Sequence, residues 1–248
     1  MQQYTLEICA GSARDCVKAE NAGADRIELC SALSLGGLTP SLGLIRSVKK
    51  TCSLPIAAML RPRAGGFYYT NDEFGEILYD ANTFIDEGVE GIVFGFLSTD
   101  RAIDIERTEK LVKIAKDAKI EAVFHRAFDI TPDLAESAKI LIDLGVDRIL
   151  TSGGKSNAGD GIPAIRALQD TYGDKVQFLA GSGVTLENAR QILDEAGVSQ
   201  IHTTAKADVN DIAYASEFID YSELPTKKGI RHEVDEQIVR AFRSLSKE

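Results

Sequence analysis

Four segments of the sequence repeat one pattern, in which a helical run ends in glycine and a short β-rich stretch follows at once. The four glycines lie in NAGADRIEL, DEGVEGIVF, DLGVDRIL and EAGVSQIH, at Gly23, Gly88, Gly145 and Gly197. Glycine suits the left-handed backbone position after a helix because it has no Cβ to clash. The intervals are too long for a solenoid repeat, but each has room for two strand-helix units.

A second set of strand-like stretches lies between these four, which brings the expected strands to eight. This second set is at Leu6–Cys9, Ile56–Arg61, Glu121–His125 and Val176–Ala180. Helix-start signals separate the strands, at Ser12, Thr39-Pro40, Asn71-Asp72, Thr131-Pro132 and Thr185. Eight strands that alternate with helices predict a single parallel (β/α)₈ TIM barrel over residues 1–248. We expect an irregular segment from about Asp208 to Arg231 and then a closing helix over Val234–Ser244.

Composition excludes several classes of function. The formal net charge is -10 and the basic residues are scattered, which argues against a nucleic-acid partner. The sequence has neither a long apolar run nor a secretory start, so we expect no membrane partner and a cytoplasmic location. In that reducing compartment we expect the four cysteines to be free thiols.

The interior of the predicted barrel carries sulfur and charge. If the most apolar strand positions face the helices, Glu7 and Cys9 point inward on the first strand, and Arg26, Glu28 and Cys30 on the second. Neighbouring strands lie ~4.8 Å apart, so the two sulfurs could share a ligand. Two thiolates suit a soft ion such as Cu(I). The alternative is that both cysteines are small buried hydrophobes.

The carboxylates Glu7 and Glu28 need partners, because an ionised carboxylate is rarely buried alone. Candidate partners are Arg26, Arg61 and Arg63. These groups are either part of a catalytic site or an ion-pair layer that only stabilises the barrel.

Two histidines end predicted strands at the mouth of the barrel. His125 ends the fifth strand, next to Arg126, and His202 ends the eighth. Histidine is the natural general acid or base near neutral pH, although a structural role is an equal alternative. We expect His232, near the start of the last helix, to lie on the surface.

The loops after strands six to eight resemble the anion-binding loops of many barrels, in which backbone N–H groups at a helix start bind the anion. We expect Lys155, beyond the sixth strand, to be a solvated loop lysine rather than a Schiff-base former. The candidate substrate- or anion-binding residues are Arg26, Arg63, Arg126, Ser152, Gly181, Ser182, Gly183, His202 and Thr203.

Seven motifs together resemble the CutC family, named for copper homeostasis. They are LEIC, NAGADRIELCSAL, GGLTPSLG, RPR, FHRAFD, LTSGGKS and GSGV, in order over about the first 205 residues. The resemblance implies a cytoplasmic TIM barrel with Cu(I) on Cys9 and Cys30. Two departures are Ala64 and Gly66, where relatives commonly have glycine and aspartate. Thr203 and Thr204 follow the strand-eight histidine, so no third sulfur is available there.

Two functional hypotheses follow. The first is a copper-homeostasis protein that binds Cu(I) through Cys9 and Cys30. The second is an isomerase or lyase acting on a small anionic or phosphorylated metabolite.

We expect no nucleotide or redox organic cofactor, because no motif for one appears. We expect a homo-oligomer, specifically a dimer. A protein-contact function ranks last, because the sequence shows no exposed apolar stripe. The catalytic residues of the second hypothesis are His125, Glu28, Glu7 and Arg61.

Overall fold

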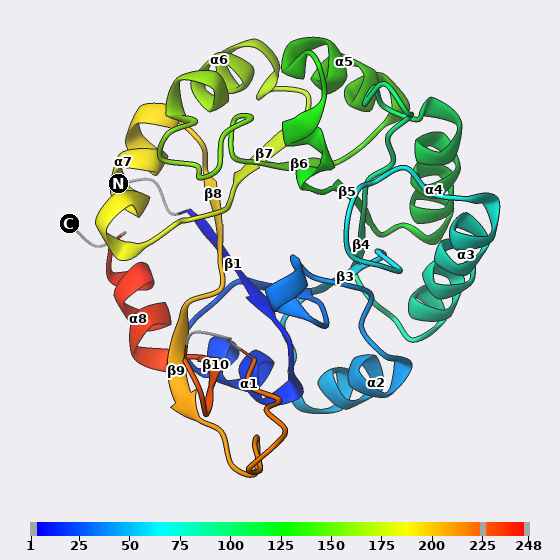
Figure 1. Cartoon of the computed structure of the whole chain (residues 1–248). Helices are drawn as coiled ribbons and strands as arrows, with labels where there is room; N and C mark the ends of the chain where they lie inside the picture. The colour runs from blue at the N-terminus through cyan, green and yellow to red at the C-terminus, as the bar shows by residue number, and fades with distance from the viewer. Residues whose placement is uncertain (1–3, 224–226, 246–248) are drawn as a thin grey trace.

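Eight parallel strands close into a barrel in the computed structural model, which describes residues 4–223 and 227–245 (Figure 1). Neighbours around the barrel follow the chain order, and β8 pairs with β1 to close it. The predicted fold class is confirmed. The strands are β1 (Thr5–Ala10), β2 (Arg26–Leu29), β3 (Ile56–Met59), β4 (Gly91–Phe94), β5 (Glu121–Phe124), β6 (Arg148–Thr151), β7 (Gln177–Ala180) and β8 (Gln200–Thr203).

A ring of helices surrounds the barrel (Figure 1). Their starts are fixed by side chains that accept hydrogen bonds from free backbone N–H groups, such as Ser12 for α1 and Thr70 for α3. All four repeat glycines have positive φ, as the sequence pattern predicts. The helices are α1 (Ala13–Asn21), α2 (Leu42–Thr51), α3 (Asn71–Asp86), α4 (Ile105–Ala118), α5 (Leu134–Leu144), α6 (Ile162–Tyr172), α7 (Leu186–Ala196) and α8 (Glu236–Ser244), with short 3₁₀ turns η1 (Leu33–Leu35) and η2 (Arg126–Ile130).

The main hydrophobic core lies between the barrel and the helices. Alternate strand residues such as Ile8, Ile27 and Ile92 are fully buried there. The intervening residues face the barrel interior, where Val93 and Val123 form a separate small apolar cluster with Cys9 and Cys30. The interior is therefore apolar where Val93 and Val123 project, and β1, β2, β6 and β8 contribute polar side chains to it.

The C-terminal segment is more regular than the sequence predicts. Strands β9 (Lys206–Asn210) and β10 (Ile230–Val234) pair antiparallel as a hairpin, and the irregular part is confined to the connection between them. Helix α8 begins at Glu236 rather than Val234, because Asp235 caps it. His232 lies in β10, where its Nε2 is 3.2 Å from a carboxylate oxygen of Asp208. Figure 1 shows the connection extending away from the barrel.

Within residues 4–223 and 227–245, no helix combines the length and the apolar character needed to cross a bilayer.

Candidate functional site

A layer of buried charges fills the interior of the barrel below its mouth, with Glu7 at its centre. The carboxylate of Glu7 lies 2.5 Å from Nε of Arg26, 3.1 Å from Nη1 of Arg148 and 2.8 Å from Nδ1 of His202. Arg148 also pairs with Glu121 at 2.6 Å. These contacts provide the partners that a buried carboxylate requires.

Two residues of this layer, Arg148 and Glu121, were not predicted as site residues from the sequence, and Arg148 is the more deeply buried. It is completely buried and comes from DLGVDRIL, where it occupies the same place that Arg26 occupies in NAGADRIEL. The repeat itself was therefore the signal that could have found it.

Electrostatics hold Glu7 ionised. Burial alone would raise the pKa of its carboxyl group, but Arg26 and His202 outweigh burial and lower that pKa to about 2. Glu7 therefore carries its charge at neutral and mildly acidic pH.

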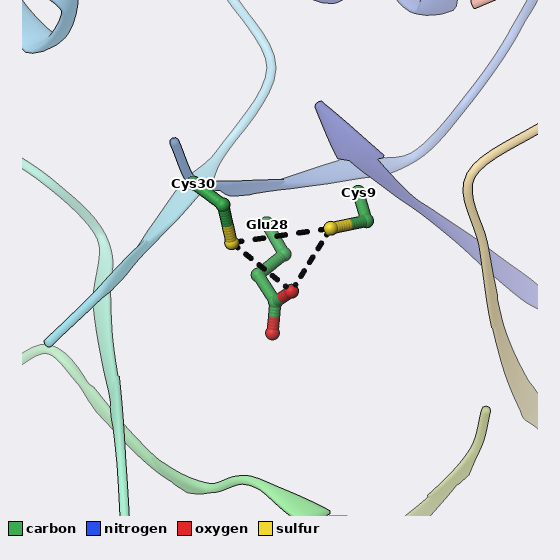
Figure 2. A group of neighbouring side chains, drawn as sticks. All are labelled: Cys9, Glu28 and Cys30. Atoms are coloured by element: carbon green, nitrogen blue, oxygen red, sulfur yellow. Dashed lines mark hydrogen bonds between the residues drawn. The ribbon is translucent and has the colours of Figure 1, made fainter. Parts of the chain in front are cut away.

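Two sulfur atoms and a carboxyl group from β1, β2 and the residue that follows β2 meet in the barrel interior (Figure 2). The Sγ atoms of Cys9 and Cys30 are 3.9 Å apart. Oε2 of Glu28 lies 3.2 Å from Sγ of Cys9 and 3.5 Å from Sγ of Cys30. All three side chains are buried, and their ligand atoms lie close enough together to hold one metal ion. The structure thus brings together the residues that strand alternation predicted.

The two thiols differ in their pKa values and in their accessibility from the cavity. The hydrogen bond with Cys30 and the neighbouring His202 together lower the pKa of the Cys9 thiol to about 5. They outweigh burial, which alone would raise this pKa. The same hydrogen bond and burial raise the pKa of Cys30. Cys30 is fully buried beneath Gly37, where an added Cβ would lie 3.0 Å from its Sγ. Cys9 lines the cavity at the barrel mouth, so it is the more accessible sulfur.

His202 connects the charged layer to the sulfur atoms. Its Nδ1 faces Glu7, and its Nε2 lies 3.7 Å from Oε2 of Glu28. Burial disfavours the protonated imidazole, but Glu28, Cys9 and Glu7 outweigh burial and raise its pKa. When the ring is neutral, an N–H on Nδ1 that donates to Glu7 leaves the lone pair of Nε2 free to bind a metal. Glu7, Glu28 and His202 also form a candidate metal-binding group of their own.

The carboxyl group of Glu28 belongs to both candidate metal groups. Burial and the neighbouring Cys9 raise its pKa, so the side chain favours the neutral acid form. In that form it can donate a proton.

A cavity of about 720 Å³ opens above this cluster at the barrel mouth. Its volume lies within the range of small-molecule sites. Among the residues that line it are Cys9, Glu28, Arg61, Phe67, His125 and His202. Glu7 and Arg26 lie below it and are not lining residues.

His125 is held as a neutral ring at the wall of the cavity. Its Nδ1 accepts a hydrogen bond from the backbone N–H of Ala127 at 3.1 Å. Burial, assisted by the charges of Arg61 and Arg126, lowers its pKa to about 3. The proton of the neutral ring is therefore on Nε2, which is buried and has no hydrogen-bond partner in the described part of the chain.

Arg61 ties together the loops at the mouth. Its guanidinium group donates to the carbonyl oxygens of Leu35 at 2.9 Å, Gly37 at 3.0 Å and Gly65 at 2.9 Å. Its Nε is buried and has no partner among the described residues. The arginine therefore has both a structural role and an unused donor.

The remaining predicted arginines lie differently. Arg63 points away from the cavity and pairs with Glu73, because the chain turns after β3 ends. Arg126 lines the cavity, but its Nε is bound to Asp129 at 2.8 Å and its Nη2 donates to Ser152 at 2.9 Å. Ser152 is itself buried by this network.

Asp129, the last residue of the FHRAFD motif, holds the neighbouring loop in place. It accepts hydrogen bonds from the hydroxyl of Thr151 at 2.6 Å and from the backbone N–H groups of Ser152 and Gly154. This pattern makes Asp129 the residue that fixes the loop after β6.

The predicted anion loop reaches the cavity only in part. Ser182, Gly183 and Thr203 line the cavity, whereas Gly181 is not a lining residue. Glu187, in the first turn of α7, also lines the cavity, and hydrogen bonds from the Thr185 hydroxyl and the backbone lower the pKa of its carboxyl group. A helix start that already has a nearby carboxylate is less favourable for a second anion.

Comparison with known proteins places the chain in a family. Residues 4–207 match the CutC family. A CutC family protein of Treponema denticola is 48% identical over 205 residues, which are 83% of this chain and 82% of that relative. A CutC family protein of Glaesserella parasuis is 44% identical over 201 residues, 81% of this chain and 82% of the relative.

Solved structures agree. The crystal structure of a Streptococcus agalactiae CutC, whose name refers to copper homeostasis, has a TM-score of 0.77 and 32% identity, and the match covers 82% of this chain and 99% of that one. A phosphoribosylanthranilate isomerase from Thermotoga maritima has a TM-score of 0.58 at 14% identity, over 100% of this chain and 99% of that one, which shows a shared fold alone. By the extent of the family match and the identity to its relatives, the chain belongs to the CutC family.

Proposed function

We propose that this protein binds Cu(I) through Cys9 and Cys30 as part of copper homeostasis. The observation that carries the proposal is the pair of buried sulfur atoms 3.9 Å apart, of which Sγ of Cys9 belongs to a residue that lines the cavity at the barrel mouth. Thiolate–metal bonds are ~2.3 Å long at zinc sites, so an ion of similar size fits between the two sulfurs with little movement of either strand.

The chemistry of the donors favours a soft ion. Thiolates bind Cu(I) in preference to hard cations such as magnesium. The lowered pKa of Cys9 supplies one thiolate near neutral pH, and binding of the ion would displace the proton of Cys30. Glu28 favours its neutral form and is a poor ligand in that state. Glu28 lies with both sulfurs in one candidate metal group and would become a third donor on losing its proton, whereas His202 is not part of that group.

Competition with a chromogenic Cu(I) chelator tests the proposal. We expect the parent protein to hold one Cu(I), and the Cys9→Ser/Cys30→Ser double variant to bind at least 100-fold more weakly. The matched control is Cys16→Ser/Cys52→Ser, which removes the two other buried cysteines and leaves the cavity intact. A Cys9→Ser/Cys30→Ser protein that competes as well as the parent contradicts the proposal, as does a parent that binds Zn²⁺ more tightly than Cu(I).

A second candidate function is an isomerase or lyase that acts on a small anion in the same cavity. It is favoured by the neutral His125 ring, whose Nε2 has no partner among the described residues and no role in the proposed copper site. The neutral acid of Glu28 is a candidate proton donor to such a substrate. A thermal-shift screen of phosphorylated and carboxylated metabolites tests this function, and no stabilisation by any of them counts against it.

A cytoplasmic location and a homodimer belong to the same proposal. Cell fractionation tests the first, and light scattering of the purified protein tests the second.

A further inference from the structure

We infer that the cavity binds a small organic carboxylate, whose oxygens accept hydrogen bonds from Nε2 of His125 and Nε of Arg61. The inference rests on the second candidate function, since it requires a small-molecule ligand in the cavity. It assigns the chemical class of that ligand and makes His125 a hydrogen-bond donor rather than a base.

The buried charge of Arg61 is the first observation. The side chain is only 7% exposed, yet its partners are all neutral: the carbonyl oxygens of Leu35, Gly37 and Gly65, and the hydroxyl of the buried Tyr69. Within residues 4–223 and 227–245 no carboxylate forms an ion pair with it. A buried cation without a counter-charge is costly. An anionic ligand would supply the missing negative charge.

The second observation is the fixed tautomer of His125. Because its Nδ1 accepts the N–H of Ala127, the neutral ring can only donate from Nε2. The residue is 4% exposed, and Nε2 has no partner in the described structure. A buried donor without an acceptor costs roughly 1–3 kcal/mol, which an oxygen of a ligand would recover.

The two donors belong to one region of the cavity. The ring of Phe67 contacts both residues: its centre is 5.3 Å from Cζ of Arg61 and 4.8 Å from the centre of the His125 ring. All three residues line the cavity. His125 fits there because Gly95 has no side chain, since an added Cβ would lie 2.4 Å from its Cε1.

The surroundings select a carboxylate over a phosphate. One guanidinium group and two N–H donors suit a monoanion with two oxygens, whereas a phosphate dianion needs more donors. Leu33, Met59 and Leu150 line the same cavity and suit a hydrocarbon body. The carboxylate of Glu187 also lines it and opposes additional negative charge on the ligand.

Benzoate is a suitable probe, with the neutral isostere benzamide and inorganic phosphate for comparison. Titration calorimetry of the copper-free protein should show benzoate binding at least tenfold more tightly than either. Equal affinity for benzoate and benzamide would overturn the inference, because the charge of Arg61 would then play no part.

Two substitutions at one position isolate the donor of His125. His125→Asn keeps an acceptor for Ala127 but is too short to place an N–H at Nε2, and we expect it to weaken benzoate about tenfold. His125→Gln restores an N–H near that position and should recover affinity to within about threefold of the parent. The remote control Arg166→Gln, on the exposed face of α6, should leave affinity unchanged.

The outcomes separate this inference from the function on which it rests. If His125→Asn binds benzoate as tightly as the parent, the inference fails. If phosphorylated metabolites stabilise the protein and benzoate does not bind, the ligand class is wrong while the second candidate function stands. If no small anion binds at all, both fail, and copper binding is unaffected.

Discussion

Cys9 and Glu28 lie directly opposite one another on neighbouring strands, with the Sγ of Cys9 3.2 Å from Oε2 of Glu28. The contact follows from the register of the barrel, which pairs Glu7 with Arg26 and Cys9 with Glu28 along β1 and β2. The same register stacks the sulfur atoms on a layer of charge, and this layer is where the stability of the site can be tested.

We predict that Glu7→Gln is strongly destabilising. The substitution leaves the buried Arg26 and Arg148 without their shared carboxylate, and breaking such a pair costs about 3–5 kcal/mol. Urea denaturation measures the free energy of unfolding. The control Asp170→Asn removes an exposed partner of Arg166 and should cost less than ~0.5 kcal/mol. If the two variants lose the same free energy of unfolding, the buried layer contributes no more to stability than an exposed ion pair does.

The stabilising effect of Glu7 should depend on pH in a defined direction. Its pKa is about 2 in the folded protein and 4.5 ordinarily, so the unfolded chain binds the proton more readily. The stability due to this difference, about 3 kcal/mol, is fully present above pH 4.5 and is lost as pH falls towards 2. The stability gap between the parent and Glu7→Gln should therefore narrow between pH 6 and pH 3. A gap that stays constant over that range would show that the pKa of Glu7 is not lowered.

We predict opposite effects for two glycine-to-alanine substitutions. Gly95→Ala places a methyl group 2.4 Å from Cε1 of His125, so the ring must move, at a cost of about 1–3 kcal/mol. Gly75→Ala, in α3, meets no atom within 4 Å and should stabilise the helix by about 0.5–1 kcal/mol.

Thermal unfolding measures both changes, and the NMR signals of the His125 ring report its displacement in Gly95→Ala alone. An unmoved ring in that variant would contradict the close packing of His125.

Alanine substitutions at two phenylalanines, Phe242 and Phe218, should have very different effects on the free energy of unfolding. Phe242 of α8 is buried, and Phe242→Ala should cost about 3–5 kcal/mol. Phe218, in the β9–β10 connection, is 87% exposed, and Phe218→Ala should change the free energy of unfolding by less than ~0.5 kcal/mol. Chemical denaturation of both variants checks the pair. A large loss in Phe218→Ala would show that the connection packs against something in solution.

Strand alternation predicted the inward-facing residues correctly, because a period of two fixes which face a side chain occupies as long as the strand continues. Cys9 and Glu28 lie within or beside strands and were found in this way. Arg63 lies beyond the end of β3, where the chain turns and parity no longer applies, and only the structure shows that it pairs with Glu73.

Other features depend on contacts that no local pattern carries. Strands β9 and β10 are joined by a long connection, so their pairing is invisible to short-range periodicity. The tautomer of His125 depends on the N–H of Ala127 two residues later, and its missing partner can be recognised only once the whole cavity is assembled.

The unequal cover of the two cysteines has a kinetic consequence under the proposed function. Gly37 closes over Cys30, whereas Cys9 borders the open cavity. We therefore expect an arriving copper ion to bind Cys9 before Cys30, so that the two thiols bind the ion in a fixed order. Under this proposal Cys9 sets the rate at which a donor molecule transfers the ion, and Cys30 sets the rate at which the bound ion is released.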